Sequence, residues 1–168
     1  EGFSCGVETG GAVRCWGASD AGLFPPPAGA YVSLTAGPHH ACALNAAGEA
    51  TCWGNRAAGQ TSVPPGARFS TLGAGSLVTC GLGLDGGASC WGALPRASPT
   101  EPAVPLPPQW RYRDVQLGRD TLCAQRTDGY RVCLGPNQPP VMLPPMPEEN
   151  ATRLFRSGCY QAAAGYVA

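Results

Sequence analysis

The chain has 168 residues, including 24 glycines, 18 prolines and nine cysteines, and its formal net charge is zero. The balanced charge argues against a nucleic-acid partner, and the absence of any apolar run of about 18 residues gives no membrane span. All 11 basic side chains are arginine, which excludes Schiff-base and phosphate-loop lysine chemistry from this segment.

One cysteine pattern recurs along the chain. Two cysteines with nine residues between them, and a glycine six positions after the first, occur four times, at Cys5/Cys15, Cys42/Cys52, Cys80/Cys90 and Cys123/Cys133. A fifth copy begins at Cys159 and Gly165, and the sequence ends at Ala168, one residue before the expected second cysteine. The first cysteines are 37, 38, 43 and 36 residues apart. A period of roughly 20–50 residues predicts a repeat architecture.

Each copy predicts a β-hairpin closed by its own disulfide. If Cys42 and Cys52 lie opposite each other on antiparallel strands, residues 46–48 form a three-residue loop and Gly48 takes its left-handed position. Opposed Cα atoms are then about 4.5–5.5 Å apart, within disulfide range. We therefore predict bonds 5–15, 42–52, 80–90 and 123–133, and no bonds between repeats.

Side chains along residues 40–44 alternate in size. His40, Cys42 and Leu44 should point to one face of the hairpin, and Ala41 and Ala43 to the other. The alanine face is small enough for another layer to approach closely.

Further elements follow in chain order. Short strands are expected at Tyr31–Thr35, Phe69–Leu72 and Asp114–Leu117, and Gly37, Gly75 and Gly118 each stand five residues before a hairpin cysteine. Two proline-rich segments, 93–109 and 136–149, are predicted to be surface loops with polyproline character. These prolines are either unmodified or hydroxylated and glycosylated. Asn150 begins an Asn-Ala-Thr sequon, so we expect a glycan there.

Paired cysteines predict an oxidising compartment, and therefore an extracellular or cell-surface location. Zinc is the alternative, but structural zinc sites use cysteines two to four residues apart with spaced histidines, whereas His39 and His40 are adjacent. We therefore expect no metal and no cofactor. The two histidines are expected to be structural or surface residues, and Cys159 is expected to pair with a cysteine directly after Ala168.

The second repeat carries a recognisable signature. His40, Leu44, Gly48, Trp53-Gly54-Asn55 and Gly59-Gln60, with a step near 38, resemble repeats of the regulator-of-chromosome-condensation type. Those repeats build seven-bladed β-propellers with one repeat per blade. The short step is similar to the bacterial β-lactamase-inhibitor propellers, and the added cysteine pair is similar to the extracellular propeller of plant Crinkly-type receptor kinases.

This resemblance implies an all-β fold, a β-propeller of short antiparallel blades, each with one disulfide-stapled hairpin. Residues 1–168 are expected to be part of one propeller domain and to cover about four and a half of seven blades; a closed four-bladed ring is the alternative. Tryptophans at a fixed place in the repeat are expected to pack between blades, together with one leucine; these core residues are Trp16, Trp53, Trp91 and Leu44.

The sequence has no G-x-S-x-G, H-E-x-x-H or G-x-G-x-x-G motif in the strand and helix context that each of these motifs requires. We therefore expect a protein that is not an enzyme. The predicted function is an extracellular interaction or structural module of a larger secreted or cell-surface glycoprotein. Its partners would be proteins, with glycans as a further possibility, and its contacts would use loops 93–109 and 136–147. Three alternatives remain: a ligand-binding receptor-kinase ectodomain, an enzyme-inhibiting propeller, and an enzyme with a site shared between blades. The disulfides and the sequon disfavour the family's nuclear exchange activity on a small GTPase.

Overall fold

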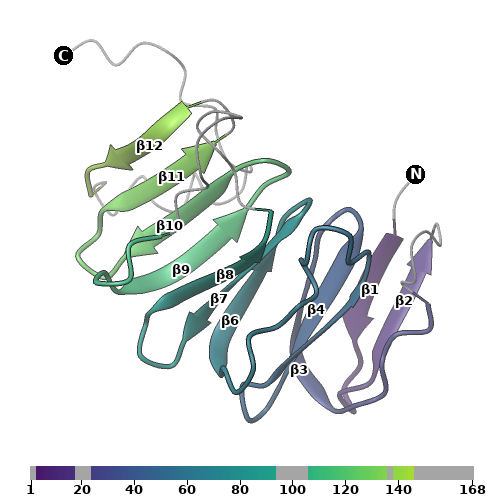
Figure 1. The fold of residues 1–168 in the computed structure, drawn as a ribbon. Coiled ribbons are helices and arrows are strands. Elements are labelled where there is room, and N and C mark those ends of the chain that lie inside the picture. Colours follow the sequence, from purple (N-terminus) through teal and green to yellow (C-terminus); the bar gives the residue numbers. More distant parts are fainter. Residues whose placement is uncertain (1–2, 18–23, 94–105, 136–137, 146–168) are drawn as a thin grey trace.

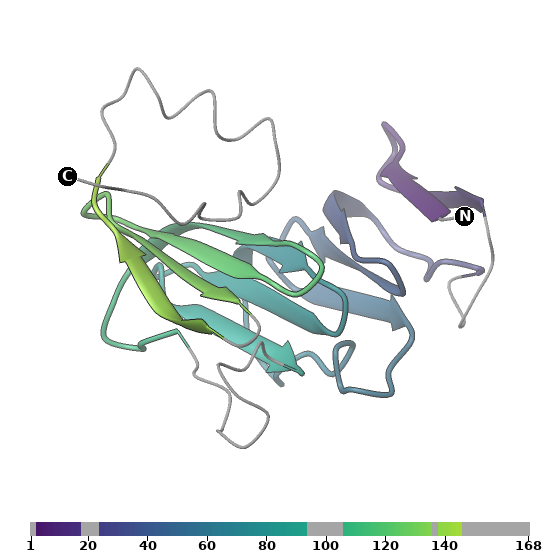
Figure 2. The same ribbon diagram turned by 90° about the horizontal axis from the view of Figure 1, so that it is seen from above.

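The chain was analysed as a computed structural model, which describes residues 3–17, 24–93, 106–135 and 138–145. These residues contain twelve strands in four antiparallel sheets and no helix, which confirms the all-β fold class. Figures 1 and 2 show the sheets side by side in chain order. None of the described residues forms a helix long and apolar enough to cross a membrane.

Each sheet is called a blade here. Blade 1 consists of β1 (Phe3–Val7) and β2 (Val13–Gly17); blade 2 of β3 (Tyr31–Ala36), β4 (His40–Asn45) and β5 (Ala50–Gly54); blade 3 of β6 (Phe69–Ala74), β7 (Val78–Gly83) and β8 (Ala88–Gly92); and blade 4 of β9 (Tyr112–Leu117), β10 (Leu122–Arg126), β11 (Arg131–Gly135) and β12 (Gln138–Leu143). Within each blade, strands consecutive in sequence are hydrogen-bonded neighbours.

The four hairpins have the predicted register. The two cysteines of every pair are directly opposed on adjacent strands. The turn glycines Gly11, Gly48, Gly86 and Gly129 have φ values of 83°, 79°, 79° and 93°. These values lie in the left-handed region, where a side chain is strained.

Strand β12 corrects one expectation. The proline-rich segment 136–149 was predicted to be a loop, but Gln138–Leu143 pairs with β11 as the last strand of blade 4. Pro139 and Pro140 lack amide hydrogens, which an edge strand tolerates because one side has no strand partner. The register shifts between Cys133 and Gly135, which is where these prolines stand.

The C-terminal part of the other proline-rich segment, 93–109, also differs from the predicted surface loop. Leu106, within the predicted loop 93–109, is buried in an apolar cluster between blades 3 and 4. Residues 94–105 lie outside the described part of the chain.

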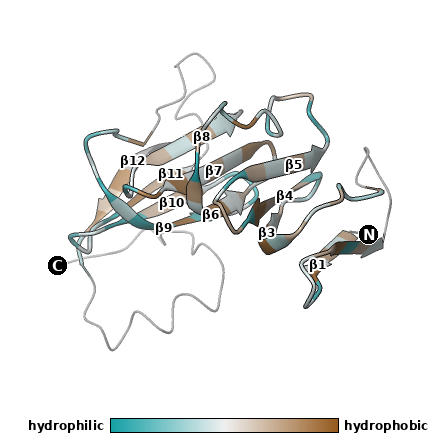
Figure 3. Cartoon of the chain, turned by 90° about the horizontal axis from the view of Figure 1, so that it is seen from below, coloured by the Kyte–Doolittle hydropathy of each residue, from teal (hydrophilic) through white to brown (hydrophobic). Residues whose placement is uncertain are grey.

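Blades pack through opposite faces of their hairpins. Ala41 and Ala43 are fully buried against blade 1, in a cluster that includes Val13. Leu44, on the other face of β4, packs against Phe69 of blade 3. The predicted alternation of the two faces is therefore present. Figure 3 shows apolar colour along the strands and hydrophilic colour mostly at the turns.

A repeated backbone hydrogen bond joins each turn to the next blade. The amide groups of Tyr31, Phe69 and Tyr112 donate to the carbonyls of Gly11, Gly48 and Gly86 at 2.8, 2.8 and 2.7 Å. Each of the three aromatic residues begins the first strand of its blade and is buried. The turn glycine therefore closes one hairpin and also positions the start of the following blade.

Blades converge along their first strands. Strands β3, β6 and β9 contact one another in series. A side chain at Gly37 would clash with the carbonyl oxygen of Gly75, and one at Gly75 would lie 3.0 Å from the carbonyl oxygen of Gly118. Gly37 and Gly75 are therefore required by close approach between blades rather than by a turn.

The structure overturns the expectation for Trp16. Its side chain is 57% exposed, whereas Trp53 and Trp91 are buried. Trp53 packs toward blade 1 and Trp91 toward blade 2, so each contacts the preceding blade. Trp16 lies opposite Ser4 and over Gly6, on the face of β1–β2 that points away from blade 2. No described residue covers that face.

Replacing the turn glycine should destabilise the fold. In Gly48→Ala the new methyl group would lie 2.7 Å from the Phe69 carbonyl oxygen on a backbone with φ of 79°. We expect the free energy of unfolding to fall by about 2 kcal/mol or more, measured by urea denaturation. The matched control is Gly10→Ala, which has no heavy atom within 4 Å of the added methyl group. Equal destabilisation by the two substitutions would contradict the proposed role of Gly48.

Candidate functional site

The four disulfides lie within the four hairpins, as predicted, at Cys5–Cys15, Cys42–Cys52, Cys80–Cys90 and Cys123–Cys133. The Cα–Cα distances are 4.0–4.1 Å. In the described residues, no group of three or more metal-ligating side chains comes together.

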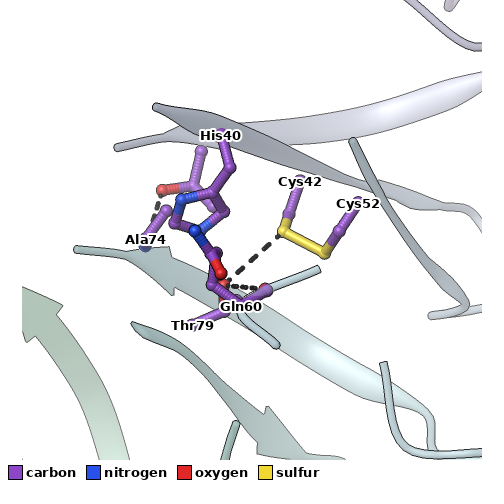
Figure 4. Close-up of a disulfide and its surroundings, with 7 residues drawn as sticks. His40, Cys42, Cys52, Gln60, Ala74 and Thr79 are labelled. Atoms are coloured by element: carbon purple, nitrogen blue, oxygen red, sulfur yellow. Dashed lines mark hydrogen bonds between the residues drawn. A yellow bond between two sulfur atoms is a disulfide. The ribbon is translucent and has the colours of Figure 1, made fainter. Parts of the chain in front are cut away.

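A buried polar cluster joins blades 2 and 3 next to one of these disulfides (Figure 4). His40 Nε2 lies 2.7 Å from Thr79 Oγ1, and the Thr79 hydroxyl donates to the carbonyl of Gln60 at 2.8 Å. Cys42 Sγ is 3.9 Å from the same hydroxyl. His40, Gln60 and Thr79 are all 0% exposed.

Hydrogen-bond directions fix the proton on His40. The single hydroxyl proton of Thr79 goes to Gln60, so His40 must donate through Nε2–H. Nδ1 is then an acceptor, and it has no hydrogen-bond partner. Burial, with a smaller contribution from His39, lowers the pKa of His40 from 6.5 to about 4. The ring is neutral at pH 7 and closed off from solvent, so it holds two blades together rather than exchanging protons with a substrate.

Residues 55–60, which belong to the signature of the second repeat, form the loop that supports the buried polar cluster. Asn55 Oδ1 accepts from the amide of Ala57 at 2.9 Å, and Gln60 Oε1 accepts from the amide of Ala58 at 2.9 Å. The Gln60 side chain also lies 3.4 Å from Asn55 Oδ1. Both side chains therefore fix the loop backbone, which presents the Gln60 carbonyl to Thr79.

A second cluster is partly exposed at the turn end of blade 4. The guanidinium carbon of Arg126 lies 4.3 Å from the ring centroid of Trp110 and 5.7 Å from that of Tyr130. The Tyr130 residue is 39% exposed and the Arg126 side chain 20%. Arg126 also forms an ion pair with Asp128. We call Trp110, Arg126 and Tyr130 the aromatic–arginine cluster.

A residue of blade 3 lies near the aromatic–arginine cluster. Arg111 forms an ion pair with Asp85 of the β7–β8 turn, at 3.6 Å, and its carbonyl accepts from the amide of Thr127 at 2.9 Å. Tyr112 donates its hydroxyl to the Pro107 carbonyl at 3.3 Å, and burial, opposed by Arg126, raises the pKa of Tyr112 to about 12. No sequence motif predicted this cluster, because packing of the connection before β9 against the end of β10 and the following turn brings its members together.

Several predicted sites lie outside the described residues. Asn150 and Cys159 fall in 146–168, and residues 94–105 make up most of one proline-rich segment. The glycan, the fifth hairpin and that loop remain predictions.

The blades resemble those of known propellers. The chain is similar to the ectodomain of the receptor kinase CR4 from Physcomitrella patens, with 29% identity, a TM-score of 0.66, and coverage of 80% of this chain and 37% of that one. It is also similar to the CRINKLY WD40 ectodomain of the Arabidopsis thaliana receptor kinase ACR4, with 22% identity, a TM-score of 0.62, and coverage of 80% and 52%.

A third solved structure is yeast RCC1 (Prp20), with 18% identity, a TM-score of 0.62, and coverage of 80% of this chain and 40% of that one. No protein-family model matches the chain, and no curated protein matches it in sequence. The chain spans between about a third and a half of the length of these ectodomains. Its described residues have the fold of an RCC1-like β-propeller.

The Thr79 hydroxyl should be essential to the contact between blades 2 and 3. Thr79→Val keeps the shape but leaves a buried imidazole N–H and a buried carbonyl unpaired. We expect a loss of about 2–3 kcal/mol in the free energy of unfolding, measured by urea denaturation. Thr79→Ser keeps the hydroxyl and should cost about 1 kcal/mol. The assignment would be wrong if the valine variant were as stable as the serine variant.

His40 should also make stability depend on pH. Its pKa is lower in the folded state than in the unfolded chain, so the unfolded chain binds the proton more readily between pH 6.5 and about 4. Stability is therefore full above pH 6.5 and falls as the pH drops through this window, by up to about 3 kcal/mol. Urea denaturation at several pH values measures the slope.

The pH experiment has a matched control. His40→Gln should lose most of the slope that His40 contributes, whereas His39→Asn, which changes an exposed neighbour, should retain most of it. An unchanged slope in His40→Gln would show that other groups cause the pH dependence.

Proposed function

We propose that this chain, with its RCC1-like blades, is a non-catalytic interaction or structural module of a larger secreted or cell-surface glycoprotein. The observation that carries the proposal is the disulfide within every described hairpin. Such bonds persist in oxidising compartments and are rare in the cytosol and nucleus. Similarity to two plant receptor-kinase ectodomains favours the same location.

The side chains of the described residues support a binding role rather than a catalytic one. The one histidine with a strongly lowered pKa, His40, is fully buried between blades. The carboxylates of Glu49, Asp85 and Asp128 are at the surface, each paired with an arginine. Among the described residues, these acids do not belong to any group of three or more His, Cys, Asp or Glu side chains that could hold a metal ion.

Contacts with partners are expected on the surface segments that differ between repeats. These are 93–109 and 136–147, because rigid blades with variable connections are a common basis for recognition. Within the second segment, Met142 on β12 is exposed. Proteins are the expected partners, and a glycan remains a further possibility.

A ligand-binding receptor ectodomain is the second candidate function. It is favoured by the 29% identity to the CR4 ectodomain, although this chain spans only 37% of that protein. Under this alternative, the protein would bind a peptide or glycan and would not form a permanent assembly.

Photo-crosslinking in the native extracellular material tests the proposed function. A photoreactive amino acid at Met142 should crosslink to another protein, whereas the same group at Val32, exposed on β3, should not. Recovery of the protein in the cytosol, or the absence of crosslinks at Met142 and within 93–109, would contradict an extracellular interaction module.

The sequon gives an independent test of the location. Protein isolated from its own secretory pathway should carry a glycan on Asn150, seen as a mass increase of the peptide that contains it. Asn150→Gln should remove the increase, and Asn45→Gln, outside any sequon, should leave it. An unmodified Asn150 peptide would count against passage through that pathway.

A further inference from the structure

We propose that the aromatic–arginine cluster binds a proline-rich segment of a partner protein in the polyproline II conformation. This inference rests on the proposed function, because it names the class of partner that an extracellular interaction module would take. Four features of the described residues carry it: the spacing of the two rings, their free donors, the cluster's charge and the prolines already packed beside it.

The spacing of the rings suits this ligand. Arg126 lies 4.3 Å from the centroid of Trp110 and 5.7 Å from that of Tyr130, so the two rings are no more than about 10 Å apart. A polyproline II helix has three residues per turn and rises about 3.1 Å per residue, so residues on one side repeat about every 9 Å. One turn of this helix therefore lies within the upper limit on the distance between the two aromatic rings.

The rings also carry free hydrogen-bond donors. A polyproline II chain makes no internal hydrogen bonds, so its carbonyls need donors from the surface on which it docks. In the described part of the chain, neither the Trp110 indole N–H nor the Tyr130 hydroxyl has a hydrogen-bond partner. Aromatic rings with such donors are the usual receptors for proline-rich peptides.

Charge favours an uncharged ligand. Arg126 is paired with Asp128, and Arg111 with Asp85, so the region has no net charge from these four residues. An acidic peptide would have to compete with two carboxylates already in place. A proline-rich segment needs no charge partner, and the stacked arginine holds both rings in position before binding.

The chain's own prolines already use this surface. Pro145 packs on the turn next to Tyr130, since a methyl group at Gly129 would lie 3.1 Å from its Cβ. The carbonyl of Pro108 accepts a hydrogen bond from Arg111 at 3.0 Å. As noted, Tyr112 binds the Pro107 carbonyl in the same way. Capture of a proline carbonyl, one of the contacts proposed for the partner, therefore occurs within the molecule.

Fluorescence anisotropy with labelled decapeptides tests the proposal on the full chain. Decaproline should bind saturably, whereas a glycine–serine decapeptide should not. Tyr130→Ala should weaken decaproline binding by about fivefold or more, since it removes one ring and its hydroxyl. Tyr130→Phe keeps the ring and should have a smaller effect. Trp16→Ala, which removes an exposed ring on blade 1, is the control and should leave binding unchanged.

Four outcomes would overturn the proposal: no binding of decaproline, equal binding of the glycine–serine peptide, unchanged binding in Tyr130→Ala, or preferential binding of a decaglutamate peptide that weakens with salt. Tyr130 is largely at the surface, so Tyr130→Ala should remain folded, which its unfolding midpoint verifies. If decaproline fails to bind while Met142 still forms photo-crosslinks, the interaction module stands and only the partner class is wrong.

Discussion

Contact between the disulfide face of one hairpin and the opposite face of the next blade is the interaction on which the structure depends. The blades are sheets of two to four strands, each five or six residues long, and each blade buries its apolar faces against its neighbours. Ala41 and Ala43 let blade 1 approach closely, and Cys52 and Leu44 form the other face. The disulfide fixes the register, and a slip of one residue would exchange the two faces.

Residues at the same two positions of the repeat meet at each described interface between blades, but the side chains at those positions differ from one interface to the next. Between blades 1 and 2 it is Phe3 with Ala41, and between blades 3 and 4 it is Val78 with Leu122, all in apolar clusters. Between blades 2 and 3 the equivalent pair is His40 with Thr79, hydrogen-bonded at 2.7 Å. A buried polar pair is costly to mismatch, so this interface distinguishes its proper neighbour from the other blade faces.

Local features were predictable from the sequence because they depend on short-range geometry. The spacing of Cys42, Gly48 and Cys52 is enough to specify a hairpin, its turn and its disulfide. The bond from His40 to Thr79 spans 39 residues and depends on how blades stack, so only the placement of His40 on the cysteine face hinted at it. Trp16 occupies the same repeat position as Trp53, and the pattern alone does not reveal that no described residue covers it.

Proline content alone also does not predict the conformation of residues 138–143. Prolines indicate loops on average, but Gln138–Leu143 is an edge strand, where the missing amide hydrogens cost little. Beside this strand, the aromatic–arginine cluster joins Trp110, from the connection before β9, to Arg126 at the end of β10 and to Tyr130 in the following turn. Described prolines of both segments, Pro107 and Pro145, therefore lie next to members of this cluster.

Disulfide mapping of the protein isolated from its native source tests the central claim that each of the four disulfides lies within one blade. Cleavage at Arg14, Glu49, Asp85 and Arg126 separates the two cysteines of each pair. Further cleavage at Asp20, Arg68 and Arg111 separates neighbouring pairs, so non-reducing mass spectrometry can assign every bond. The account predicts peptides linked 5–15, 42–52, 80–90 and 123–133. Peptides linked between blades, such as 15–42 or 52–80, would contradict it.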